Sequence, residues 1–373
     1  MTTTRRLLLQ ASALLPLSKA RAASKSAGVY AQLGVRPIIN FQGTMTTLGA
    51  SKIVPEFHEA MAEASREYVI LEELRDKIGE RLATLTGCPA AMVTTGASGA
   101  IALGTCAALT GANMANVRKL PDLAAMKKEV IIQKPHRNVY DHAVRSTGVK
   151  IIDVENKEQL LRAIGQETAM MYYLGAESHD WEWETPVGLE ECLAIARKAG
   201  FPVLVDAANM LPPWENIRKL AAQGVDMICI SGGKHMRGPQ CSGILAGRKD
   251  LIQAAVMNSS ANSDSHGRPM KVGREEMIGV WLAAERYSKL DFEAMDRQCA
   301  RQADYLQAQL AKIPGLKVGR TPFDRTRRVH RVSVEWDEQA LKLTTRDVQQ
   351  KLRDGEPASL CSGPSAGSNS RSS

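Results

Sequence analysis

Residues 201–247 read FPVLVDAANMLPPWENIRKLAAQGVDMICISGGKHMRGPQCSGILAG, and this stretch decides the fold. It holds two short apolar runs, Val203–Val205 and Met227–Ile230, which are rich in β-branched residues and bounded by turn residues. Such runs predict strands that are buried on both faces of a sheet. The first run ends in Asp206, and the second leads through the letters SGG into Lys234. The stretch therefore delivers a carboxylate and an amine from the ends of two buried strands.

Asp206 and Lys234 are an unusual pair in this position. Burial penalises the charged form of each side chain unless a partner compensates for the lost water. One chemistry needs both residues: a lysine that forms a Schiff base, and an aspartate that keeps a pyridine nitrogen protonated. Each residue alone has an ordinary explanation, as an aspartate that caps a turn or a surface lysine after a strand. Together they predict a site for pyridoxal phosphate (PLP).

Strands and helices alternate along the middle of the chain. The pattern predicts strands at Ala91–Val93, Glu129–Gln133, Lys150–Val154 and Ala169–Leu174, and helices at Lys157–Ile164 and Leu189–Ala199. Alternation at this spacing predicts an α/β fold with parallel βαβ units and a sheet covered on both faces. Ligands of such sheets bind beyond the carboxyl ends of the strands. Because Gly96, His136, Asp206 and Lys234 all fall at or just after strand ends, we expect them to converge on one site.

A glycine-rich turn follows the first of these strands, in the sequence TTGASG at residues 94–99. Small residues between a strand and a helix let backbone N–H groups approach a phosphate, and the helix N-terminus favours negative charge. The turn matches neither a Walker motif nor GxGxxG, so a nucleotide is not the first expectation. Beside a PLP lysine we expect Gly96, Ala97 and Ser98 to hold the cofactor phosphate. A tight turn packed under a buried helix is the alternative.

Composition limits the other classes of function. The chain has 373 residues, 44% of them hydrophobic, which is enough for a large core and more than one domain. The net charge of +8 comes from basic residues scattered among acidic ones, so nucleic acid is an unlikely partner. The 7 cysteines show no metal-ligand spacing, so we expect neither a metal site nor a disulfide framework. No apolar run is long enough to span a membrane.

Both ends of the chain differ from its middle. Residues 1–23 place Arg5 and Arg6 before an apolar stretch and a small-residue cleavage site, so we expect a twin-arginine signal peptide and export to the periplasm. A cytoplasmic protein with a ragged N-terminus is the alternative. Residues 354–373 are rich in Gly, Ser and Pro, which is typical of a low-complexity tail. We therefore expect the small C-terminal domain to be truncated.

The segment SGGKHMRGPQCSGILAGRKDLI, which begins at Ser231, resembles the PLP-lysine segment of one group of enzymes. The group contains the bacterial selenocysteine synthases and the glucosaminate-6-phosphate ammonia-lyases, and it belongs to the fold-type I, aspartate-aminotransferase-like superfamily. The letters GPQ, followed by the small-residue strand Gly243–Gly247, are the most specific part. The resemblance extends roughly from Val35 to Leu290.

The resemblance implies a fold and a set of contacts. The fold is a three-layer sandwich with a mainly parallel sheet and a smaller C-terminal α+β domain, in chains that pair as homodimers or assemblies of dimers. His136 would stack on the cofactor ring, with the capping of the following helix as the alternative. The implied cofactor-binding residues are Gly96, Ala97, Ser98, His136, Asp206, Ala208, Ser231 and Lys234. The candidates for binding the substrate or the partner's cofactor phosphate are Thr44, Arg137, Arg237, Arg268 and Lys271.

The expected domain order follows from these patterns. It is a signal peptide at 1–23, an N-terminal arm at 24–54, a large PLP-binding domain at 55–288, a small domain at 289–353 and a tail at 354–373. Further expected elements are a helical segment from Pro55 to Thr86, a helix at Asp291–Ile313, strands at Leu316–Val318 and Arg328–Val334, and a helix at Thr345–Leu352.

The expected function is that of a PLP-dependent lyase. Its substrate would be a small amino acid or amino sugar acid, which loses a proton at the α-carbon and then a β-substituent. Water would hydrolyse the resulting enamine to ammonia and a keto acid. One alternative is a transferase that loads selenium onto seryl-tRNA. Others are a different PLP reaction, such as transamination, racemisation or aldol cleavage, and an inactive truncated member of the group.

Overall fold

The computed structural model describes residues 28–175, 185–321 and 329–363. Among these, residues 49–175 and 185–292 form a larger compact unit, and residues 28–48, 293–321 and 329–363 form a smaller one. The expected N-terminal arm is thus divided near Gly49 between the two units. The predicted signal peptide at 1–23 and the last part of the predicted tail, 364–373, lie outside the described residues.

The larger unit is built on a seven-stranded sheet with the order β2-β8-β7-β6-β5-β3-β4. Its strands are β2 (Ala90–Thr95), β3 (Glu129–Gln133), β4 (Lys150–Val154), β5 (Thr168–Leu174), β6 (Val203–Asp206), β7 (Met227–Ser231) and β8 (Ser242–Gly247). Only β8 pairs antiparallel with its neighbours β2 and β7, and the other pairs are parallel. No helix separates β7 from β8, and a parallel connection needs a crossover of a dozen or more residues, so β8 runs backwards.

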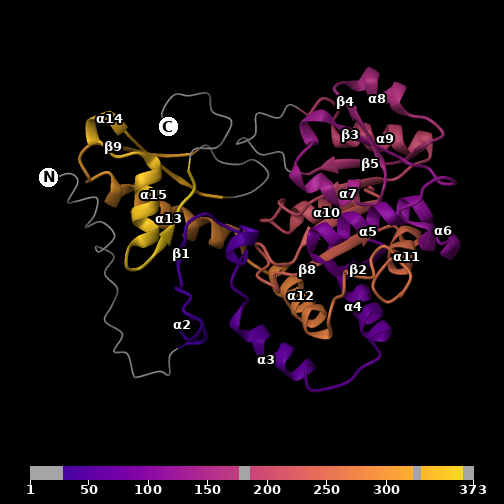
Figure 1. Cartoon of the computed structure of the whole chain (residues 1–373), viewed down its shortest axis with the longest axis horizontal. Helices are drawn as coiled ribbons and strands as arrows, with labels where there is room; N and C mark the ends of the chain where they lie inside the picture. The colour runs from indigo at the N-terminus through magenta and orange to yellow at the C-terminus, as the bar shows by residue number, and fades with distance from the viewer. Residues whose placement is uncertain (1–27, 176–184, 322–328, 364–373) are drawn as a thin grey trace. The chain divides into compact units, whose positions relative to one another are not determined.

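Helices cover both faces of this sheet (Figure 1). They are α3 (Pro55–Ala64), α4 (Leu71–Thr86), α5 (Gly96–Thr110), α6 (Met114–Lys119), α7 (His142–Arg145), α8 (Lys157–Ala163), α9 (Leu189–Ala199), α10 (Glu215–Ala222), α11 (Lys249–Met257) and α12 (Arg274–Tyr287), with 3-10 turns η3 (Lys134–His136) and η4 (Val139–Asp141). Met170 and Tyr172 of β5 pack into one core cluster with α5, α7 and α11. Met171 and Tyr173 are equally buried but lie outside that cluster, as expected when successive side chains point to opposite faces. The fold is the predicted three-layer α/β sandwich.

The helical segment predicted from Pro55 to Thr86 is two helices, α3 and α4, rather than one. The connecting residues Tyr68 and Ile70 are exposed by 97% and 60%, so a continuous helix there would bury no apolar face. At the other end the prediction holds, because α4 ends where Gly87 takes the left-handed conformation, with φ of 78°. No described helix is long and apolar enough to cross a membrane.

The smaller unit contains two short sheets and the flanking helices. Its elements are α2 (Val29–Gln32), β1 (Ile39–Asn40), η2 (Thr46–Leu48), α13 (Phe292–Leu310), β9 (Leu316–Arg320), β10 (Val332–Trp336), α14 (Glu338–Leu341), α15 (Thr345–Asp354) and β11 (Ser359–Leu360). β9 and β10 form an antiparallel hairpin, which places the second strand a few residues later than predicted. β11 lies within the predicted low-complexity tail, 354–373, and pairs in parallel with β1. Composition missed this strand because its hydrogen bonds come from a distant part of the chain.

Candidate active site

The ends of β6 and β7 bring the predicted carboxylate and lysine together. Asp206 is the last residue of β6 and lies opposite Cys229 in the parallel strand β7. Lys234 follows β7 after Gly232 and Gly233, and its charge acts on the Asp206 carboxyl to lower the pKa. The two side chains are therefore electrostatic neighbours at one edge of the sheet, as the sequence predicts.

Asp206 is buried, with 6% of its surface exposed, and both of its carboxyl oxygens accept hydrogen bonds. The Tyr172 hydroxyl donates to Oδ2 over 2.8 Å, and the Ala208 N–H donates to Oδ1 over 3.0 Å. Burial raises the pKa of Asp206, while these two hydrogen bonds and the charge of Lys234 lower it. The net pKa is raised, so the groups around Asp206 offset only part of the burial penalty on the carboxylate.

The first turn of α5 presents backbone N–H groups beside these strands. Its N-cap, Thr95, makes no side-chain capping bond, and the first turn carries no acidic residue. Gly96 has φ of 64°, which favours glycine. A Cβ on Gly243 of β8 would lie 2.8 Å from the Ala97 nitrogen and closer still to the Gly96 carbonyl. The turn therefore packs directly on Gly243 of β8, which pairs with Ser231 of β7. Its N–H groups suit a phosphate.

His136 ends the η3 turn after β3 and is 2% exposed. Burial lowers its pKa to about 4, so the ring is neutral at physiological pH. Its Nδ1 accepts a hydrogen bond from the Leu174 N–H over 3.3 Å, which leaves the ring proton on Nε2. The ring of Tyr173 contacts it edge-on at 4.5 Å. Asn138, not His136, caps the following turn, by accepting from the Tyr140 N–H over 2.8 Å.

Residues 49–54 hold the loop that carries Lys234. The Ser51 hydroxyl donates to the Gly233 carbonyl over 2.6 Å. Arg237 has φ of 61°, and its Nε donates to the Lys52 carbonyl over 3.0 Å. A Cβ on Gly233 would lie 2.5 Å from Cα of Gln240, so the loop folds tightly on itself. The Arg237 side chain is thereby used, at least in part, to anchor the lysine loop.

The other candidate substrate-binding residues come from separate segments of the chain. Arg137 donates through Nε to Asp141 over 2.5 Å and through Nη1 to Asp153 over 2.7 Å, so two carboxylates already engage its guanidinium. Arg268 and Lys271 are exposed in the loop before α12, where Arg268 donates to the Ser260 carbonyl over 3.3 Å. Thr44 belongs to the smaller unit. The roles of these residues stay predictions.

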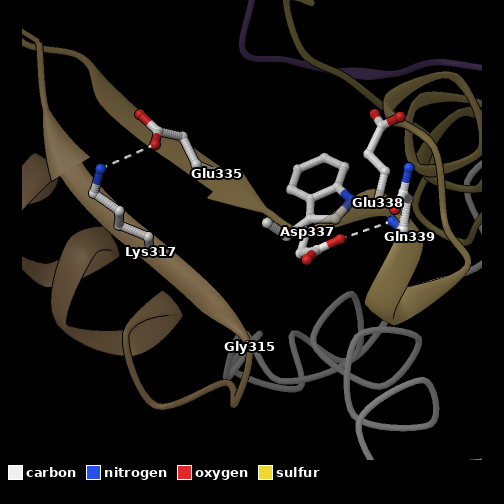
Figure 2. Close-up of a pocket in the computed structure, with 7 residues that line it drawn as sticks. Gly315, Lys317, Glu335, Asp337, Glu338 and Gln339 are labelled. Atoms are coloured by element: carbon white, nitrogen blue, oxygen red, sulfur yellow. Dashed lines mark hydrogen bonds and ion pairs between the residues drawn. The ribbon is translucent and has the colours of Figure 1, made fainter. Parts of the chain in front are cut away.

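A separate hollow of about 610 Å³ lies in the smaller unit, and Figure 2 shows the residues that line it. Its polar groups pair with one another: Lys317 contacts Glu335 over 3.2 Å, and the Asp337 carboxylate accepts from the Gln339 N–H over 2.9 Å. None of the predicted site residues lines this hollow. We therefore place the candidate site at the strand ends of the larger unit.

Comparison with known proteins decides the family. The family model for aminotransferase class-V matches residues 142–364. The chain belongs to this family. It is 31% identical to D-glucosaminate-6-phosphate ammonia lyase from Salmonella typhimurium, over 88% of each chain. It is 30% identical to a 5'-C-glycyluridine monooxygenase-decarboxylase from a Streptomyces species, over 88% of this chain and 82% of that one.

Other matches within and around the family agree with this assignment. A solved structure of D-glucosaminate-6-phosphate ammonia-lyase superposes with a TM-score of 0.78 at 30% identity, covering 92% of this chain and 90% of that one. L-seryl-tRNA(Sec) selenium transferase from Aquifex aeolicus is 24% identical over 88% of this chain and 78% of its own. These matches confirm the predicted aspartate-aminotransferase-like fold and identify the chain as a PLP-dependent enzyme.

The residues present fit the cofactor. A buried carboxylate suits a protonated ring nitrogen, a neutral buried histidine suits the ring face, and an uncapped helix start suits the phosphate. Sequence reasoning missed two contributors, Tyr172 and Ser51. Tyr172 sits in an unbroken apolar strand with no local mark of a polar role, and only the pairing of β5 with β6 brings it to Asp206.

Proposed function

We propose that this protein is a PLP-dependent lyase that releases ammonia from a small amino acid or amino sugar acid. The observation that carries the proposal is the juxtaposition of Asp206 and Lys234 at the ends of two parallel strands. The relative that is 31% identical and named as an ammonia lyase supports the reaction class. The cofactor, when bound, supplies an electron sink for negative charge that develops next to an amino group.

Each residue of the chain has a task in this proposal. Asp206 keeps a proton on the ring nitrogen, because a carboxylate beside that nitrogen favours its charged form. Lys234 would supply the amine that holds the cofactor aldehyde, and its amino group would move the proton at the substrate's α-carbon as a general base and general acid. The N–H groups of Gly96, Ala97 and Ser98 bind the phosphate, with Ser231 beside them.

The remaining contacts orient the cofactor and the substrate. His136 would face the cofactor ring as a neutral imidazole, which would add no positive charge beside the protonated nitrogen. Ala208 contributes its backbone N–H to Asp206. Arg268 and Lys271 are exposed basic residues of the loop before α12, so they are the candidates for binding an acidic substrate group.

The experiment measures ammonia and keto-acid release from D-glucosaminate 6-phosphate, D- and L-serine and related amino sugar acids. We expect equal amounts of both products, independent of dioxygen, and none from Lys234→Ala. Independence of dioxygen matters because a second relative, at 30% identity, is named a monooxygenase-decarboxylase. Product formation that stops when dioxygen is removed, or transfer of the amino group without ammonia release, would contradict the lyase assignment.

A selenium transferase is the second candidate, because seryl-tRNA(Sec) selenium transferases are 24–28% identical to this chain. The contacts of the candidate site favour the transferase no more than the lyase. Basic residues that could bind tRNA are partly neutralised by acidic neighbours, as Arg137 is by Asp141 and Asp153. Binding of tRNA would decide between them. A tRNA partner predicts an affinity that falls steeply with salt, whereas the lyase predicts no binding at moderate salt.

Pairing and export complete the proposal. The exposed apolar run of Tyr68, Val69, Ile70 and Leu71 in the larger unit favours a homodimer, since such a run is expected to be covered by a partner. Sedimentation of the wild type and of an Ile70→Asp variant would test it. Export by the twin-arginine route predicts that replacing Arg5 and Arg6 by lysine retains the protein in the cytoplasm.

A further inference from the structure

The side chain of Asn138 is held in one orientation. Its Oδ1 accepts from the Tyr140 N–H over 2.8 Å, and its Nδ2 donates to the His136 carbonyl over 3.0 Å. An amide has two donors and one acceptor group, so these bonds identify which end is the nitrogen. The Asn138 side chain also lies near enough to the Tyr172 hydroxyl to lower the pKa of that phenol. With its oxygen already turned toward Tyr140, the group it offers to Tyr172 is the second N–H.

The Tyr172 hydroxyl therefore has a defined direction. Its proton points to Oδ2 of Asp206, 2.8 Å away, and its oxygen is influenced by the nearby Asn138 amide. Tyr172 is fully buried, and burial, followed by the Asp206 charge, raises its pKa well above the usual range. The phenol consequently keeps its proton at any physiological pH and acts only as a donor toward Asp206.

The direction of these bonds favours the carboxylate form of Asp206, against the burial that raises its pKa. Oδ2 accepts from Tyr172, and Oδ1 accepts from the Ala208 N–H over 3.0 Å. Protonation would turn one of these oxygens into a hydroxyl, which accepts a hydrogen bond more weakly than a carboxylate oxygen and needs an acceptor for its own proton. The arrangement is therefore complementary to the carboxylate and opposes the acid.

We propose that Tyr172, oriented by Asn138, is a positioning residue that keeps Asp206 in its carboxylate form for the ring nitrogen of the cofactor. The inference rests on the proposed role of Asp206. Because Asn138 also holds the carbonyl of His136, one amide connects the residue at the ring face with the residue at the ring nitrogen. Neither Asn138 nor Tyr172 carries a sequence signal for such a role.

The test compares the binding of two probes, PLP and its 1-deaza analogue, in which carbon replaces the ring nitrogen. The wild type should prefer PLP, since only PLP offers an N–H to the carboxylate. In Tyr172→Phe we expect PLP to bind about tenfold more weakly, the value of one hydrogen bond to a charged group. The analogue should change by less than about twofold, because it makes no bond that depends on the charge of Asp206.

A matched control and a second variant keep the test sharp. Tyr287→Phe removes the hydroxyl of another fully buried tyrosine, one whose Oη has no hydrogen-bond partner among the described residues, and it should change the binding of neither probe. Asn138→Asp retains an acceptor for Tyr140 but removes the donor to Tyr172. Made alone, Asn138→Asp should reduce the preference for PLP over the analogue. Made together with Tyr172→Phe, it should change that preference no further. Asn138→Asp also tests the inference if Tyr172→Phe does not fold.

The outcomes separate this inference from the proposed function. Equal weakening of both probes in Tyr172→Phe would show a merely structural role and overturn the inference. An unchanged preference for PLP in both Tyr172→Phe and Asn138→Asp would also overturn it. If Asp206→Asn keeps the wild-type preference, the assignment of Asp206 to the ring nitrogen fails as well. If Asp206→Asn abolishes the preference and Tyr172→Phe keeps it, only the present inference fails.

Discussion

Gly243 of β8 lies directly against the first turn of α5, where a Cβ would approach the Ala97 nitrogen to 2.8 Å and the Gly96 carbonyl even more closely. The atoms nearest to such a Cβ are backbone atoms of Gly96 and Ala97, so a side chain at residue 243 would fit only if the first turn of α5 moved. The strand that runs backwards in the sheet thus sets the position of the N–H groups that we assign to the phosphate. A glycine is needed at 243 for close approach rather than for its backbone angles.

Gly243→Ala should therefore weaken cofactor binding. Overpacking of this kind typically destabilises by about 1–3 kcal/mol, and here the strain falls on the first turn of α5. We expect the dissociation constant for PLP to rise by about tenfold or more, measured by fluorescence or equilibrium dialysis. Gly165→Ala is the control, since a Cβ there meets nothing within 4 Å. Wild-type affinity in Gly243→Ala would show that the turn does not bind the phosphate.

Lys234→Ala should abolish the visible absorbance that the wild type gains with PLP and that borohydride removes. The reason is that Lys234 supplies the only amine assigned to the cofactor aldehyde in the proposed site. Circular dichroism of the variant should match that of the wild type. Lys198→Ala, at an exposed position in α9, is the control and should keep the absorbance. A persistent band in Lys234→Ala would place the Schiff-base lysine elsewhere.

Ser51→Ala should loosen the loop that carries Lys234. The lost hydrogen bond to the Gly233 carbonyl is worth about 1 kcal/mol in stability. Because the loop bears a catalytic residue, we expect kcat to fall several-fold while the substrate KM changes little. Ser65→Ala removes a similar bond, from Ser65 Oγ to the Ala62 carbonyl at the exposed end of α3, and should leave kcat unchanged. The same small loss of stability in both variants, with no loss of kcat in Ser51→Ala, would argue against a positioning role.

Acid should destabilise the protein through His136. Burial lowers the pKa of this residue from 6.5 to about 4, so the folded state binds fewer protons than the unfolded state between those values. The contribution of His136 is complete above pH 6.5 and is lost as the pH falls toward 4, by on the order of 3 kcal/mol. Urea unfolding at several pH values would measure it.

The control for that measurement is a histidine on the surface. His136→Gln should flatten the dependence of unfolding free energy on pH in this window, whereas His58→Gln, at an exposed position in α3, should leave it as in the wild type. A slope that is unchanged in His136→Gln would show that other groups cause the acid sensitivity.

The local sequence determined the chemistry of the site. Apolar runs that end in Asp206 and in SGGK, and a glycine-rich turn at Gly96, are short-range patterns, and each one depends only on neighbours along the chain. The alternation of strands and helices was equally predictable, because the spacing of apolar residues along a segment depends only on that segment. From these patterns the α/β fold, the cofactor and the strand-end position of the site all followed, and the family comparisons bear out the fold and the cofactor.

Only the tertiary structure decided which residues serve Asp206 and Lys234. Tyr172 reaches Asp206 because β5 lies beside β6, and Ser51 reaches Gly233 across many residues of chain. The pairing of β11 with β1 joins the two ends of the described chain in the same way. Hydrogen bonds between strands and loops far apart in sequence leave no periodic trace in either segment. Their partners are selected by strand order and burial, which a single sequence read along its length does not contain.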